Sequence, residues 1–323
     1  MVSHLLEVEN LKVTFALRTG DLTAIDDVSF VLNSKEKLGL VGESGAGKSV
    51  TGFSIINLIS KPGYISGGRV IFEGRQLNTL SEKEMRSVRG NQISMIFQDP
   101  MMTLNPVLTI KSQMIETVRA HKNVTKKEAE KLALEKLEKV YIPSPEKRLN
   151  QYPHECSGGM RQRIVIAIAL LTDPSLIIAD EPTTALDVTI QAGIMDLLSE
   201  LCETENMGLI LITHDLAVVS EVTEKIAVMY AGKIIESGQT DTIISNPKHP
   251  YTQGLIKSLP SAIQTGKTLT QIPGSMPTLT EIPNGCTFHP RCEYCLPICD
   301  QEVPELYRIN NNGHMAACHL LKK

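Results

Sequence analysis

The chain has 323 residues, enough for two or three compact domains, and its apolar content of 42% and charged content of 21% are ordinary for a globular protein. Its formal net charge of −4 argues against nucleic acid as the main partner. No apolar run approaches the ~18 residues that a membrane span requires, and the N-terminal residues show no signal peptide. We therefore expect a cytosolic protein.

The spacing of the apolar residues predicts strands and helices along the chain. Two strands that alternate apolar and polar residues form a hairpin at the start, and short apolar strands follow. The expected strands are Leu5–Phe15, Thr23–Leu32, Lys37–Val41, Arg69–Phe72, Gln92–Phe97, Leu176–Ala179, Leu209–Thr213, Ile226–Met229 and Lys233–Glu236. The expected helices are Gly47–Ile59, Lys126–Val140 and Ile190–Glu203. The helix Lys126–Val140 belongs to a stretch over 103–171 that is expected to be mostly helical. The strand–helix–strand order over 176–213 indicates a parallel sheet.

A phosphate-binding loop is predicted directly after the strand Lys37–Val41. The eight residues Gly42-Glu43-Ser44-Gly45-Ala46-Gly47-Lys48-Ser49 match G-x-x-x-x-G-K-[ST] between a strand and a helix, which is the context that this motif requires. The backbone N–H groups would surround the phosphates, Lys48 would reach the β and γ oxygens, and Ser49 would ligate Mg²⁺.

Polar residues at other strand ends supply candidates for catalysis. Asp180 ends an apolar strand and would hold Mg²⁺ through water, and Glu181 would polarise the attacking water or accept its proton. Gln98 could contact Mg²⁺ or that water, and His214 could donate a hydrogen bond to the γ-phosphate. Phe15 could stack on an adenine, although a lone Phe on a strand is usually a core residue.

A second candidate anion site precedes Asp180. Ser157-Gly158-Gly159 opens a basic helix, and it offers a hydroxyl, backbone N–H groups and a helix N-terminus. One nucleotide can use this element and the phosphate loop only if the two meet in space, within one chain or between two chains.

Five of the seven cysteines lie close together, between positions 286 and 318. In a reducing cytosol such a cluster indicates a metal site rather than disulfides, and thiolates suit iron–sulfur or zinc. Cys292 and Cys295 form a C-x-x-C pair that zinc would also accept, and free thiols without metal are a further alternative. The five residues are Cys286, Cys292, Cys295, Cys299 and Cys318.

The motifs, taken in this order, resemble the nucleotide-binding subunit of ATP-binding-cassette transporters over about residues 5–238. The resemblance implies an α/β phosphate-loop NTPase core with an antiparallel β subdomain and an α-helical subdomain at about residues 101–172. It also implies that two cassettes stack head to tail. Each ATP would then lie between the phosphate loop of one cassette and Ser157, Gly158 and Gly159 of the other, with Asp187 at the seam.

Two later stretches resemble the peptide-importing branch of this family. Asn246–Thr252 looks like a segment of importers for oligopeptides, dipeptides and nickel, and Gly285–Cys292 resembles the C-terminal extension of the peptide importers. The resemblance implies a 4Fe–4S cluster on Cys286, Cys292, Cys299 and Cys318, with Zn²⁺ as the alternative. It divides the chain into a nucleotide-binding domain over 1–258 and a small Cys-rich extension over 259–323.

The implied function is ATP binding and hydrolysis in a transporter that imports dipeptides or oligopeptides across the cytoplasmic membrane. The subunit would sit peripherally on the cytoplasmic face. Its implied partners are a second ABC ATPase, related or identical, two transmembrane permease subunits and an extracytoplasmic peptide-binding receptor, without nucleic acid. Alternatives are nickel or another small solute as cargo, a soluble cassette ATPase that acts on nucleic acid or ribosomes, and a redox-sensing regulator.

Overall fold

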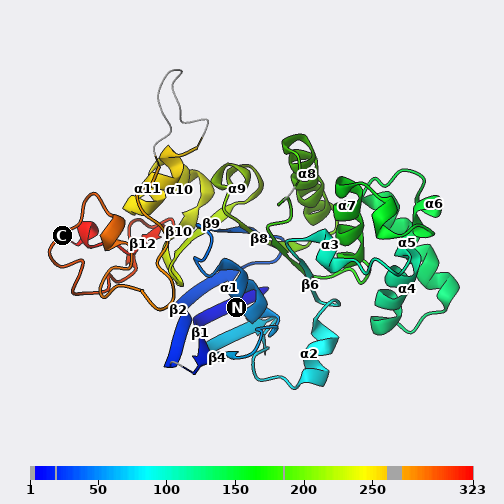
Figure 1. The fold of residues 1–323 in the computed structure, drawn as a ribbon, viewed down its shortest axis with the longest axis horizontal. Helices are drawn as coiled ribbons and strands as arrows, with labels where there is room; N and C mark the ends of the chain where they lie inside the picture. The colour runs from blue at the N-terminus through cyan, green and yellow to red at the C-terminus, as the bar shows by residue number, and fades with distance from the viewer. Residues whose placement is uncertain (1–3, 19, 185, 260–270, 323) are drawn as a thin grey trace. The chain divides into compact units, whose positions relative to one another are not determined.

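The computed structural model describes residues 4–18, 20–184, 186–259 and 271–322 (Figure 1). The chain forms two compact units, one made of Met1–Asn78 with Leu211–Lys323 and the other of Thr79–Ile210. None of the helices found in the described ranges has the length and apolar character of a membrane span.

The first unit contains a four-stranded antiparallel sheet in the order β2-β1-β4-β5. The predicted hairpin of the first two strands is confirmed, with Leu6 opposite Leu32. The strand predicted at Arg69–Phe72 begins six residues earlier, at Gly63, because β1 is long enough to pair with it along its whole length. The bounds are β1 (Leu6–Leu17), β2 (Gly20–Leu32), β4 (Gly63–Phe72) and β5 (Arg75–Gln76).

Further strands of this unit belong to a second sheet. The fully buried β3 (Lys37–Val41) pairs in parallel with β9 (Lys225–Tyr230), and β9 pairs antiparallel with β10 (Lys233–Gln239). Two short strands near the C-terminus continue the sheet beyond β10. They are β12 (Met315–Ala316), which pairs with β10, and β11 (Tyr307–Arg308), which pairs with β12. Residues 271–322, called the C-terminal extension below, therefore contribute two strands to this sheet.

Four α-helices are found among the described residues of the first unit, and the first of them follows the glycine-rich loop. This helix ends at Ile55 rather than at the predicted Ile59, because Asn57 adopts a left-handed φ of 50° that a continuing helix excludes. The helices are α1 (Lys48–Ile55), α9 (Leu216–Val222), α10 (Thr240–Ser245) and α11 (Pro250–Lys257).

The second unit combines two parallel strands with the predicted helical stretch. The strands β6 (Ile93–Ile96) and β7 (Leu176–Asp180) pair in parallel. The longer helices show clear local signals: α5 begins at a capping box of Thr125 and Glu128 and buries Ala129, Ala133 and Leu137 at intervals of four residues. The helices are α2 (Glu82–Val88), α3 (Pro100–Thr103), α4 (Ile110–His121), α5 (Lys126–Lys139), α6 (Pro145–Leu149), α7 (Gly158–Ala169) and α8 (Val188–Thr204). Strand β8 (Gly208–Thr213) crosses the division between the units.

Candidate nucleotide site

The loop of residues 42–49 lies between β3 and α1 in the first unit, and it packs so closely that two of its glycines have no room for a side chain. At Gly42 a Cβ atom would lie 2.3 Å from the backbone oxygen of Met229. Gly47, the N-cap of α1, has a φ of 102°, and a Cβ atom there would lie 2.6 Å from Cδ1 of Ile25. Close packing therefore requires glycine where the motif has it.

Lys48 is buried, and its ammonium group lies over the loop. The Nζ atom donates hydrogen bonds to the backbone oxygens of Gly42, at 2.7 Å, and of Glu43, at 3.0 Å. Gly232 also holds the loop, since its N–H donates a hydrogen bond to the backbone oxygen of Ala46 at 2.9 Å. The loop is therefore a preformed cradle that holds a positive charge.

In the second unit, the acidic pair lies at the end of β7. Asp180 is buried, with 3% of its surface exposed. Glu181 adopts a left-handed φ of 44°, a conformation that costs a residue with a Cβ atom about 1 kcal/mol and is typical of functional sites. Its Oε2 atom accepts a hydrogen bond from Nε2 of Gln98 at 3.0 Å and one from Oγ1 of Thr184 at 2.9 Å. The structure thus brings Gln98 and Glu181, 83 residues apart, into direct contact.

The Ser-Gly-Gly element lies at the N-terminus of α7 in the same unit. The exposed Ser157 is the N-cap, and its hydroxyl accepts a hydrogen bond from the N–H of Met160 at 3.3 Å. A Cβ atom at Gly159 would lie 3.0 Å from Cγ2 of Ile190. Cys156 is buried, and burial raises the pKa of its thiol.

The remaining predicted residues lie in the first unit. His214 is exposed directly after β8, and Phe15 is half-buried on β1 with its ring packed against the backbone of Gly63. Phe15, the loop and His214 thus belong to one unit, whereas Gln98, Asp180, Glu181 and the Ser-Gly-Gly element belong to the other. Ala185, beside the predicted seam residue Asp187, lies outside the described residues, as does the start of the predicted extension at 260–270.

All seven cysteines lie in the described residues, and none of them forms a disulfide bond. Four of them, Cys286, Cys292, Cys299 and Cys318, line one small cavity. The side chains of His249, His289 and His319 line the same cavity, so it lies between the N-terminus of α11 and the C-terminal residues. Cys295 is exposed and is not among the residues that line it. Burial raises the pKa of Cys286 to about 11 and also raises the pKa of Cys292 and Cys318. Within the described part of the chain, no three His, Cys, Asp or Glu side chains are arranged to hold a single metal ion.

Sequence reasoning missed two side chains that contact predicted site residues. Thr184 donates to Glu181, and Arg291 of the C-terminal extension forms a two-fold ion pair with Glu43 of the phosphate loop. A signal for the second existed in the sequence. A carboxylate inside a loop that binds phosphate calls for a nearby cation, although the sequence does not say which one.

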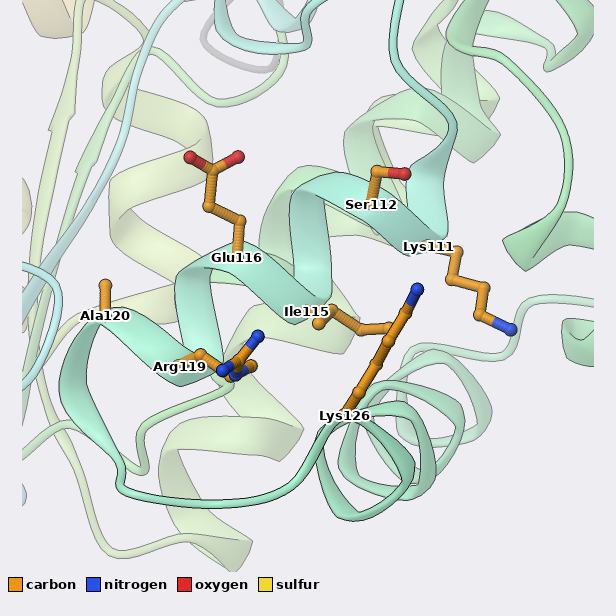
Figure 2. A pocket seen from close by; sticks show the side chains of 7 residues that line it. All are labelled: Lys111, Ser112, Ile115, Glu116, Arg119, Ala120 and Lys126. Carbon is orange, nitrogen blue, oxygen red and sulfur yellow. The ribbon is translucent and has the colours of Figure 1, made fainter.

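An open pocket on α4 and the start of α5 is separate from all of these groups (Figure 2). In Figure 2 Lys126 rises from α5 towards α4, whereas Glu116 points to the opposite side of α4. None of the predicted site residues lines this pocket. Its lining residues are Lys111, Ser112, Ile115, Glu116, Arg119, Ala120 and Lys126.

Two family descriptions match the chain. Residues 25–184 match "ABC transporter", and residues 235–299 match "Oligopeptide/dipeptide transporter, C-terminal region". The first match includes the phosphate loop, Gln98, the Ser-Gly-Gly element and the acidic pair. The second includes Arg291 and three of the four cysteines that line the cavity.

Similar proteins carry consistent names. The chain is 49% identical to the oligopeptide transport ATP-binding protein OppD of Bacillus subtilis, over 97% of this chain and 88% of that protein. It is 45% identical to the dipeptide transport ATP-binding protein DppD of Escherichia coli, over 98% of this chain and 96% of that protein. Among solved structures, a dimeric post-hydrolysis state of an ATP-binding cassette with ADP and Pi aligns with a TM-score of 0.65 and 27% identity, over 73% of this chain and 98% of that chain.

Proposed function

Since the chain belongs to the ABC transporter family and is an ATP-hydrolysing subunit of a peptide importer, we propose that its own phosphate loop, residues 42–49, holds ATP. The observation that carries this proposal is the buried Lys48 ammonium, which two loop carbonyls hold over the cradle. Backbone N–H groups of the loop would surround the phosphates, and Lys48 would reach the β and γ oxygens. Phe15 would stack on the adenine.

Ser49, Gln98 and Asp180 would hold Mg²⁺, because this ion prefers oxygen ligands and each of these side chains carries an oxygen. Asp180 in particular offers a buried carboxylate at a strand end. The bound ion would neutralise charge on the phosphates. Glu181 would accept a proton from the attacking water, with Gln98 and Thr184 holding its carboxylate in place. His214 would donate a hydrogen bond to the γ-phosphate.

A complete site would need two cassettes. The exposed Ser157 hydroxyl and the N-terminus of the 12-residue helix α7 suit an anion supplied from outside the chain. Solved structures of related cassettes are described as dimeric. We infer that Ser157, Gly158 and Gly159 contact the γ-phosphate of ATP held by the loop of a partner cassette, and that Asp187 lies at the seam.

Mixing two inactive variants tests this arrangement. In a mixed dimer of Lys48→Ala and Ser157→Arg, one site has both lesions and the other has neither. If the two cassettes share their sites, each mixed dimer therefore has one intact site. Its ATPase activity should reach up to about half of that of a wild-type dimer. If each chain used its own two elements, the mixture would stay inactive. Ser87→Arg, at an exposed serine of α2, is the matched control and should hydrolyse ATP normally.

The transport partners follow from the names of the relatives, which specify oligopeptide and dipeptide transport. We propose that the subunit works on the cytoplasmic face of the membrane with two permease subunits, a second ABC ATPase, related or identical, and an extracytoplasmic peptide-binding receptor. A run of exposed apolar side chains just after Gln98 suits contact with a permease. It comprises Met101, Met102, Val107 and Leu108. Peptide cargo predicts ATPase stimulation by peptide-loaded receptor in the reconstituted transporter, and stimulation by Ni²⁺ instead would favour the nickel alternative.

We further propose that the Cys-lined cavity binds a 4Fe–4S cluster through Cys286, Cys292, Cys299 and Cys318. Four thiols around one cavity are a suitable donor set. Zinc would need its ligands to converge on one point, and the described residues offer no such arrangement. A cubane binds each thiolate at a different iron, so its ligands lie farther apart. Anaerobic purification should yield a brown protein that absorbs near ~400 nm, and a colourless protein that contains zinc would contradict the cluster.

A further inference from the structure

Glu43 places a carboxylate inside a loop whose proposed ligand is a polyanion. An unpaired carboxylate at this position would repel the phosphates, because both charges lie in a partly buried site where screening by solvent is weak. The side chain of Glu43 is 30% exposed, so solvent screens its negative charge only in part. The loop therefore requires a cation besides Lys48 if it is to bind ATP tightly.

Arg291 supplies that cation from a position 248 residues later in the chain. Its NH1 atom lies 2.7 Å from Oε2 of Glu43 and its NH2 atom 3.0 Å from Oε1, so the two groups meet in the two-pronged geometry of a strong ion pair. The Arg291 side chain is only 6% exposed. The hydrogen bonds that Arg291 donates to the Glu43 carboxylate are the main reason why the pKa of Arg291 is raised.

The guanidinium group is held in place by the C-terminal extension itself. Its Nε atom donates to the backbone oxygen of Pro273 at 2.8 Å, and its carbon lies 5.9 Å from the ring centre of Phe288. Arg291 ends the short turn His289–Arg291, directly before Cys292 of the Cys-lined cavity. The cation is therefore preorganised by the extension and not by the loop.

The backbone of the loop is held from the same side. The N–H of Glu43 donates to the phenolic oxygen of Tyr251 at 2.9 Å. The Tyr251 ring packs edge-on against those of Tyr230 and Phe288, at centroid distances of 4.8 and 5.4 Å. Glu43 is thus fixed at both its main chain and its carboxylate by residues that lie beyond β9.

We propose that Arg291 is a positioning residue for ATP binding: it neutralises Glu43 and orients it away from the phosphates, so that the C-terminal extension sets the nucleotide affinity of the phosphate loop. The inference rests on the proposed function, in which residues 42–49 hold the phosphates. No covalent step is involved. Arg291 acts through Glu43 and does not itself contact ATP.

The test is a double-variant comparison of ATP affinity in the full-length protein, measured by titration with a fluorescent ATP analogue. Arg291→Gln should raise Kd on the order of tenfold, because it leaves Glu43 unpaired beside the phosphates. In a Glu43→Gln background, the same change should alter Kd by less than about twofold, since there is no carboxylate left to neutralise. Arg291→Lys keeps the positive charge, so its Kd should lie between those of the wild type and of Arg291→Gln.

The rescue separates neutralisation from a merely structural role. If Arg291 only fastened the extension, Arg291→Gln would weaken ATP binding equally in both backgrounds, and that result would overturn the proposal. An unchanged Kd in Arg291→Gln would overturn it as well. Arg308→Gln, at an exposed arginine of β11, is the matched control and should bind ATP as the wild type does.

Two further readouts keep the outcomes distinct. If circular dichroism shows that Arg291→Gln does not fold, the same comparison is made with Arg291→Lys, measured alone and in the Glu43→Gln background. Lys48→Ala reports on the loop itself: ATP binding that survives this change contradicts the proposed function, whereas its loss together with an unchanged Arg291→Gln contradicts only the inference. Because coupling is reciprocal, ATP should also slow hydrogen exchange at residues 285–299 in the wild type and not in Arg291→Gln.

Discussion

Replacing Glu181 by Gln tests the proposed chemistry most directly, because the structure separates its effect on rate from its effect on stability. The new side chain has the same shape, and its carbonyl oxygen can still accept a hydrogen bond from Thr184 or Gln98. The folded state then loses about one charge-assisted hydrogen bond, or about 1 kcal/mol. The amide cannot take a proton from water, so the hydrolysis rate should fall by about 10² to 10⁴, equivalent to about 3 to 5 kcal/mol in the barrier.

The assay compares ATP binding, single-turnover hydrolysis and dimer formation. Glu181→Gln should bind ATP with unchanged affinity, hold it without hydrolysis and accumulate a dimer in size-exclusion chromatography with ATP. Thr184→Val is the matched control, because it removes one hydrogen bond to the carboxylate and leaves the base in place. Its rate should fall by less than about tenfold. Ordinary turnover by Glu181→Gln would refute the assignment of the base.

Three other changes test the geometry of each unit. Gly47→Ala should destabilise the first unit by about 2 to 4 kcal/mol and abolish ATP binding, because its φ is 102° and the new Cβ would lie 2.6 Å from Ile25; thermal unfolding and ATP titration measure both effects. Ser157→Ala removes the N-cap of α7 and should cost about 1 kcal/mol in chemical unfolding while ATP affinity stays unchanged. Burial raises the pKa of Asp173, but the hydrogen bonds and charges of Lys136 and Lys122 lower it by more. The resulting pKa lies below the ordinary value of 3.8. The pairing therefore stabilises the protein above this pH and is lost as pH falls through the lowered pKa, so the stability difference between wild type and Asp173→Asn should shrink between neutral pH and pH ~3.

Much of the fold could be predicted because its signals are local. The strand Lys37–Val41 has the predicted bounds, and α5 differs from its prediction by one residue at its end. Glycine spacing in the phosphate loop reports backbone positions that exclude a side chain, as the contacts at Gly42 and Gly47 show. The end of α1 was missed because its signal is weak: one Asn in a left-handed conformation stops the helix at a point that the apolar pattern does not mark.

The sequence by itself determined the strands, the loop that cradles phosphate and the order of motifs that identifies the family, since each depends on residues a few positions apart. Only the tertiary structure decided which distant groups touch. It placed Gln98 on the Glu181 carboxylate, gathered four thiols around one cavity and paired Arg291 with Glu43 across 248 residues. Such contacts follow from the packing of whole elements. The sequence shows that a buried charge needs an oppositely charged side chain nearby, but the packing of the elements determines which side chain it is.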